Sequence, residues 1–227
     1  MLLLQGKGSA LRPFAAAALL VLFPGSGCDF SFSLSVVSDD VLPSASADVI
    51  SDPATDGSVR QDGAVVTTSA ILCGVDVAAP PPFPEDRGFL SFPLGGISPG
   101  AFIESATVTF HVDRVDLLPG SADLVLTLDH VHFGDALSFS AFSAAGAPVR
   151  GFLSGVRLVP FPGTQRVLGD VVPELQADVD DPFLRFFQLR LTGTGGVAQI
   201  VDGGGNRAGG APPDRTLVPV LSVRYRW

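Results

Sequence analysis

The chain has 227 residues, of which 46% are hydrophobic and 16% are charged, which excludes a disordered tail and a set of membrane spans. Its 26 glycines and 19 prolines disfavour long helices. The formal net charge of -9 would repel a polyphosphate backbone, so nucleic acid is not an expected partner.

The first 27 residues have the organisation of a secretory signal peptide. Lys7 and Arg12 precede an uncharged, mostly apolar run at residues 13–23. A helix needs about 20 apolar residues to span a bilayer, so this run is too short to remain as a permanent anchor. We therefore expect an exported protein.

Cys28 follows the small residues of segment 24–27, and this arrangement resembles the lipobox of bacterial lipoproteins. The resemblance implies that Cys28 is acylated, becomes the first residue of the mature chain and anchors it in the outer or cytoplasmic membrane. Gly25 stands where that family usually has an aliphatic residue, so ordinary cleavage nearby is the alternative. In that case Cys28 could pair with Cys73, which lies in an apolar run typical of a buried thiol.

Residues 28–57 are predicted to be an acidic, solvated spacer. Residues 29–56 include six aspartates and seven serines but neither Lys nor Arg. Residues 58–227 then form the predicted folded domain, which is long enough to bury a core without a metal or disulfides.

Apolar and polar residues alternate with a period of two at four places in this domain, at residues 106–112, 124–128, 187–191 and 221–225. Such alternation is typical of strands with one buried face. Connections rich in Gly and Pro separate the strands, and one short helix is expected at about residues 171–179. The pattern predicts an all-β protein, an antiparallel sandwich or barrel.

Three segments resemble the DNRLRE-type jelly-roll modules of bacterial and archaeal surface proteins. Residues 87–108 combine an arginine-led strand, a Gly-Ile-Ser-Pro turn and a strand that begins Ser-Ala. Residues 169–182 are similar to the family's short helical segment and residues 219–225 to its closing strand, whereas residues 133–137 replace its tryptophan-acidic motif. The resemblance implies an antiparallel β-sandwich of the jelly-roll type. Because relatives include carbohydrate-binding modules, it also implies a binding or structural role at the cell surface.

Two motif-like patterns do not predict an enzyme. Residues 96–100 spell G-x-S-x-G, but the residue after a nucleophile at Ser98 must donate its N–H to an oxyanion hole, and Pro99 has none. Residues 193–198 spell G-x-G-x-x-A, yet the residues that follow predict a strand rather than a helix, so a hairpin is expected. We therefore expect a protein without catalytic activity.

His130 and His132 are the candidate ligands of a transition metal. They lie two residues apart on the same face of a predicted strand, with Asp129 or Asp135 as possible support, while His111 lies on another strand. The sequence shows no third ligand, and histidines near strand ends are more often only hydrogen-bonded, which is the interpretation we favour. A metal-dependent enzyme centred on this pair is the less favoured alternative.

Asp178, Asp180 and Asp181 offer three carboxylates within four residues, and oxygen ligands of this kind suit structural calcium. A solvated acidic loop is the alternative, which we favour, and no other cofactor is expected.

Sugar-binding sandwiches commonly stack pyranose rings on exposed Trp or Tyr, and the chain has one of each, Tyr225 and Trp227. Taken together, the sequence predicts a non-catalytic cell-envelope lipoprotein with a single jelly-roll module. Its partners would be the membrane, through the lipid anchor, and a polysaccharide or an envelope protein. A carbohydrate-binding module that holds a polysaccharide in a groove is the main alternative, and the ligand-binding residues are not identified.

Overall fold

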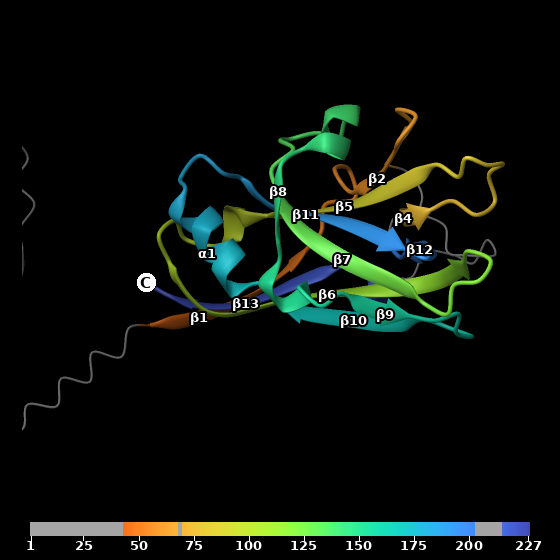
Figure 1. The fold of residues 1–227 in the computed structure, drawn as a ribbon. Helices are drawn as coiled ribbons and strands as arrows, with labels where there is room; N and C mark the ends of the chain where they lie inside the picture. The colour runs from red at the N-terminus through yellow and green to blue at the C-terminus, as the bar shows by residue number, and fades with distance from the viewer. Residues whose placement is uncertain (1–42, 68–69, 203–214) are drawn as a thin grey trace, which may run out of the picture. The chain divides into compact units, whose positions relative to one another are not determined.

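The computed structural model describes residues 43–67, 70–202 and 215–227 (Figure 1). The predicted signal peptide, Cys28 and residues 29–42 of the predicted spacer lie outside this part of the chain. No helix among the described residues is long and apolar enough to cross a membrane.

The strands are β1 Ser44–Ile50, β2 Gly57–Arg60, β3 Val65–Val66, β4 Ile71–Val75, β5 Glu85–Pro93, β6 Phe102–Leu117, β7 Leu124–Val131, β8 Gly146–Pro148, β9 Val156–Leu158, β10 Gln165–Asp170, β11 Phe186–Thr194, β12 Gly196–Ile200 and β13 Val220–Arg226. The described helices are α1 Val172–Asp180 and the short 3-10 helices η1 Leu94–Gly96, η2 Phe139–Ser143, η3 Arg150–Phe152 and η5 Arg215–Leu217.

All strand pairs in the described residues are antiparallel, and the main path through the sheet is β1-β13-β6-β12-β4-β5-β11-β7-β8. Off this path, β10 pairs with β6, β9 with β7, β2 with β5, and β3 with β2. The sheet curls round a common interior, with α1 at one end (Figure 1). This confirms the predicted antiparallel sandwich of the jelly-roll type with one short α-helix in the described chain.

Strand β6 has sixteen residues and three partners. At Thr109 it pairs with both β13 and β10, and at Val112 with both β10 and β12. Because a strand has only two edges, β13 and β12 must follow one another along the edge opposite β10. The partner strand changes near the middle of β6, and both ladders on this edge contain a register shift.

The main core is built from the inward residues of the predicted alternating segments. Their burial is confirmed for Ala106, Val108, Phe110, Val112, Leu124, Leu126, Leu128, Phe187, Leu189, Leu191, Leu221, Val223 and Tyr225. The predicted helix is also confirmed, and it directs Leu175 and Val179 into the same core.

The structure differs from the predicted spacer at residues 44–57. There β1 pairs with β13 along its whole length, from Ser44 opposite Arg226 to Ile50 opposite Val220. Alternate residues of β1, which are the small or β-branched side chains Ala45, Ala47 and Val49, pack against the core. The segment Ser-Ala-Ser-Ala carries little hydrophobic signal, so its composition resembles that of a solvated spacer. The folded part begins no later than Ser44.

The expected hairpin after β11 is also corrected. The chain does turn at Gly195, whose φ of 91° lies in the left-handed region, and a Cβ there would lie 2.4 Å from the carbonyl oxygen of Asp123. However, β12 pairs with β4 and β6 rather than with β11, whose partners are β5 and β7. The turn therefore changes the chain's pairing partners instead of closing a two-stranded ribbon.

Cys73 is fully buried on β4, as predicted, and its thiol donates to the carbonyl oxygen of Ala198 at 3.8 Å. Burial raises the pKa of this thiol to about 12, so the reactive thiolate does not form near neutral pH. A disulfide between Cys28 and Cys73 would require this part of the sheet to open.

Deletion of β13 and the last residue, Val220–Trp227, should prevent stable folding, because β13 lies between β1 and β6. Burial of its three inward side chains contributes about 5 to 9 kcal/mol, against a total stability of about 5 to 15 kcal/mol for a typical domain. The measurement is thermal unfolding by circular dichroism of the chain without residues 1–27. The matched control deletes residues 29–42, which removes no described strand and should preserve the melt. A cooperative, wild-type-like melt after the β13 deletion would contradict the role given to this strand.

Asp56 should make the stability of the domain depend on pH. Its carboxylate is fully buried and accepts a hydrogen bond from the backbone N–H of Ser91 at 2.7 Å. Burial, together with the nearby carboxylate of Asp202, raises the pKa of Asp56 well above its ordinary value. The folded state therefore binds the proton of Asp56 more tightly than the unfolded state does, so protonation of this group stabilises the fold. This stabilising contribution is complete below the unfolded-state pKa of about 3.9 and is lost as pH rises through the folded-state pKa.

Asp56→Asn replaces the protonated acid by a neutral group of the same shape. We expect the variant to become more stable relative to the wild type as pH rises from about 4 to about 8, so the difference in their free energies of unfolding shifts in favour of the variant. Chemical denaturation at a series of pH values measures the difference. Asp48→Asn, on the exposed face of β1, controls for the loss of one negative charge. Parallel stability curves for wild type and Asp56→Asn would refute the explanation.

Candidate metal centre

Two elements from different parts of the chain supply the side chains of this site. Strand β7 carries His130 at its end, where the residue lies opposite Leu189 of β11 and Ala147 of β8, and His132 follows just after the strand. Because side chains alternate along an extended chain, the two imidazoles lie on the same face, as predicted. Helix α1 packs against β6 and β11 and supplies Asp178.

The carboxylate of Asp178 joins the two imidazoles. Its Oδ2 lies 2.9 Å from Nε2 of His130, and its Oδ1 lies 2.9 Å from Nε2 of His132. In this arrangement each Nε2–H donates to one carboxylate oxygen. Ligand atoms from the three residues all lie within 4.8 Å of one another.

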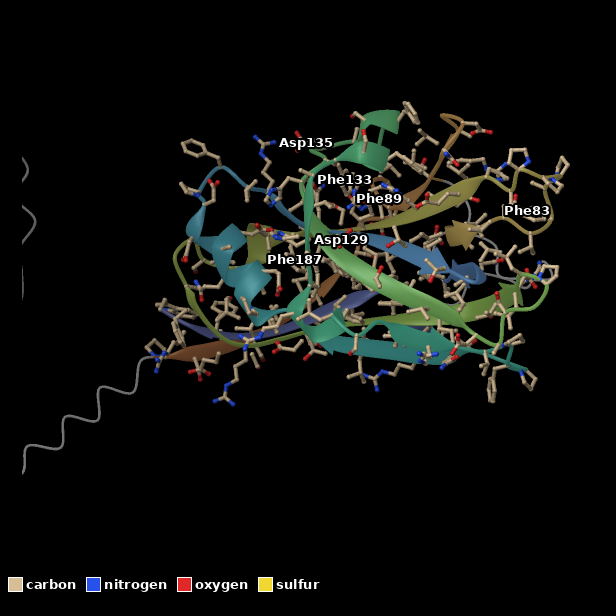
Figure 2. The ribbon with its side chains drawn as sticks, in the orientation of Figure 1. Phe83, Phe89, Asp129, Phe133, Asp135 and Phe187 are labelled. Carbon is tan, nitrogen blue, oxygen red and sulfur yellow. The ribbon has the colours of Figure 1, made fainter. Side chains whose placement is uncertain are left out.

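The site is buried on one side and open on the other. The side chain of Asp178 is 1% exposed and that of His130 is 12% exposed, whereas that of His132 is 48% exposed. The ring of His130 stacks on Phe187 at a centroid distance of 5.4 Å and meets the ring of His132 edge-on at 4.8 Å. Phe187 lies beside α1 in the interior of the domain (Figure 2).

Two glutamines fix the backbone on either side of the centre. Gln188, which is buried on β11, accepts hydrogen bonds from the backbone N–H groups of Phe133 and Gly134, at 2.8 and 3.3 Å, and donates to the carbonyl of Gly134 at 2.7 Å. It thereby holds the chain immediately after His132. Gln176 of α1 accepts from the N–H of Ile103 at 2.8 Å and donates to the carbonyl of Ala101 at 3.0 Å, which ties the helix to the start of β6.

Two cavities flank the loop that follows α1. One has a volume of about 420 Å³, is mainly apolar, and has Leu94, Ile97, Asp178 and Val179 in its lining. The other has a volume of about 330 Å³ and is lined in part by His132, Asp135 and Gln188. Leu184, Arg185 and Phe186 line both cavities. The half-exposed imidazole therefore faces space that can hold solvent or a small ligand.

The three carboxylates that are candidate calcium ligands do not share one site. Asp180 accepts a hydrogen bond from the side chain of Gln176 at 2.9 Å, and Asp181 accepts from the backbone N–H of Phe183 at 2.9 Å. Asp178 lies on the inner face of α1 beside Leu175 and Val179, whereas Asp180 and Asp181 are exposed. Among the described residues, the geometry thus groups Asp178 with the histidines instead of with the other two aspartates.

Neither of the aspartates that were expected to support the histidine pair belongs to the cluster. Asp129 forms an ion pair with Arg190 at 2.6 Å, and Arg190 also donates to the carbonyl of Ala144. Asp135 is exposed and lies at the outer margin of the domain (Figure 2). On β6, Nδ1 of His111 lies 3.1 Å from the carbonyl oxygen of Leu217, and His111 takes no part in the cluster.

Sequence reasoning missed the connection between the two candidate sites. Asp178 is 46 and 48 residues away from the two histidines in the chain. The signal that could have found it is the helical spacing of Leu175, Asp178 and Val179, which places a carboxylate within an apolar stripe. A carboxylate on a buried helix face needs a partner, so Asp178 should have been separated from its exposed neighbours.

The aromatic pair at the C-terminus is only partly accessible. Tyr225 is buried, and its hydroxyl donates to the carbonyl of Gly96 at 3.1 Å, so it cannot act as a stacking platform. Trp227 is half-exposed and lies 5.7 Å from the ring of Tyr225. The most exposed aromatic ring in the described chain is that of Phe183, at 90%, in the loop between the two cavities.

The chain matches no protein-family model and no curated protein. The structure itself is an all-β sandwich of the jelly-roll type that carries a His–His–Asp cluster beside two cavities.

Proposed function

We propose that this protein is an exported lipoprotein of a bacterial cell envelope, in which a jelly-roll module serves a non-catalytic binding or structural role at the cell surface. The observation that carries the proposal is the order of its parts. A signal-like leader ends at Cys28, and a folded sandwich begins by Ser44. The resemblance of residues 87–108, 169–182 and 219–225 to surface jelly-roll modules supports the same role.

The segment between Cys28 and β1 suits a tether. About 15 residues lie between them, and a chain of that length reaches about 50 Å at most. Asp29, Asp39 and Asp40 belong to this segment, and it contains no basic residue that would attract it to anionic lipids. A lipid on Cys28 would thus leave the sandwich in solvent near the membrane surface.

Expression of the full chain in a bacterium should give a membrane-bound form with the mass of a mature chain that begins at an acylated Cys28. Cys28→Ala should abolish incorporation of an alkyne-labelled fatty acid, because the thiol is the acylation site. Cys73→Ala is the matched control, since it removes the other cysteine of the chain, and it should keep the label. A mature N-terminus beyond Cys28, or fatty-acid labelling of Cys28→Ala, would refute the anchor.

Polysaccharide binding is the second candidate function, and the exposure of Phe183 favours it. This ring stands in the loop between the two cavities and has 90% of its surface in solvent. Stacking on a sugar ring would cover an apolar face that is otherwise hydrated.

If the loop holds a sugar, Phe183→Ala should lower affinity for the bound polysaccharide by about tenfold, the equivalent of about 1.4 kcal/mol. Affinity electrophoresis against a panel of envelope polysaccharides measures it. Phe161→Ala is the control, because Phe161 is 62% exposed but lines neither cavity. Retention of the wild-type chain on none of the polysaccharides, or equal retention of both variants, would eliminate this role for the loop.

A further inference from the structure

We propose that His130, His132 and Asp178 bind one divalent transition-metal ion, with Zn²⁺ as the reference metal. Two imidazole nitrogens and one carboxylate oxygen form a ligand set that suits zinc and other late first-row ions. Calcium instead takes six to eight oxygen ligands, so this cluster does not suit it. The proposal is independent of the surface role proposed above.

The two contacts between the imidazoles and the carboxylate are slightly shorter than the ligand separations around a bound ion. Zinc–nitrogen and zinc–oxygen bonds of about 2.0 to 2.2 Å place neighbouring ligands of a tetrahedral ion about 3.3 Å apart. Both contacts between an imidazole nitrogen and a carboxylate oxygen are 2.9 Å long. For one ion to bind all three residues, these two contacts would open by a few tenths of an ångström, and the most widely separated ligand atoms, which lie up to 4.8 Å apart, would close by up to about 1.5 Å. Each neutral imidazole would carry its proton on Nδ1 and present the lone pair of Nε2 to the metal.

A metal would also compensate the charge of Asp178. This carboxylate is almost completely buried, and among the described residues its ion-pair partners are the two histidines alone, with no Arg. A buried carboxylate without a fixed cation is costly, and a divalent ion at the centre removes that cost. By contrast, Asp129 and Asp86 each have an arginine partner.

The ligands are held in place before any ion arrives. Phe187 packs against the ring of His130, Gln188 holds the chain after His132, and Gln176 ties α1 to β6. Such preorganisation reduces the entropy lost on binding. A cluster of flexible surface side chains would lack these supports.

The centre has the features of an open metal site. Open zinc sites have three protein ligands and leave the fourth position to water or another small ligand, whereas structural sites have four protein ligands. Here the cluster provides three ligands, and His132, the most exposed of them, lines the cavity of about 330 Å³. The fourth position is thus expected to hold an exchangeable water that faces this cavity.

The test uses the untagged chain of residues 28–227, with Cys28→Ala because a free thiol is itself a zinc ligand. After treatment with a chelator, calorimetric titration with Zn²⁺ should show one site per chain. Co²⁺ should give the intense visible absorption of a four- or five-coordinate ion. Addition of azide should shift that absorption if the fourth position is exchangeable.

His132→Ala and Asp178→Asn should each weaken Zn²⁺ binding at least about tenfold. His132 is the safer site for substitution, because its half-exposed side chain adds little to the core. His111→Ala and Asp181→Asn are the matched controls and should bind Zn²⁺ as the parent chain does. Circular dichroism of each variant verifies that the fold persists.

Three outcomes would overturn the proposal. The parent chain could fail to bind Zn²⁺ or Co²⁺ stoichiometrically, His132→Ala could bind as tightly as the parent, or the controls could lose binding equally. In each case the cluster is a hydrogen-bonded support for α1 only. A Co²⁺ spectrum that is insensitive to azide would overturn the open position and leave a closed site.

Discussion

The structure depends on strand β6 and its change of partners. One edge of this strand pairs with β13 and then with β12, so a single strand belongs both to the ladder that includes β1 and to the ladder that leads to β7. Helix α1 is attached to the start of β6 through Gln176, while the histidines arrive on β7. The contact of Asp178 with His130 and His132 therefore links the helix to the opposite side of the sandwich. A shift in the register of β6 would separate these groups.

Several carboxylates of this acidic chain are buried, and three of them are accommodated in different ways. Asp56 has no ion-pair partner among the described residues, and burial raises its pKa so that the neutral acid is favoured. Asp86 forms an ion pair with Arg60 at 3.2 Å, although burial still raises its pKa, as it would for any poorly solvated carboxylate. Asp178 instead has two imidazoles on its two oxygens. In the metal-bound form proposed above, the ion would take the place of these two hydrogen bonds.

The sequence predicts most of the architecture, because period-two burial is a local property that four segments display clearly. It places the histidines on one strand face and α1 to within one residue at each end. It does not predict β1, because the small residues of this strand have the composition of a polar spacer. It also does not predict that the chain pairs with different strands after Gly195, because that pairing depends on residues far away in the sequence. The link from Asp178 to the histidines is likewise tertiary. Local spacing grouped this residue with Asp180 and Asp181, whereas the structure buries Asp178 on the inner face of α1 and leaves the other two exposed.

The pairing of the first and last described strands determines at which end of the domain β1 begins. Ser44 lies opposite Arg226, and Phe102, at the start of β6, lies next to Arg226 on its other side. Helix α1 is tied to the same region through Ile103, so β1 begins at the pole that carries the His–His–Asp cluster (Figure 1). Any tether that leaves the sandwich before Ser44 would draw this pole toward its attachment point. The β6–β7 turn at Leu118–Ser121 lies at the opposite pole, away from the start of β1 (Figure 1).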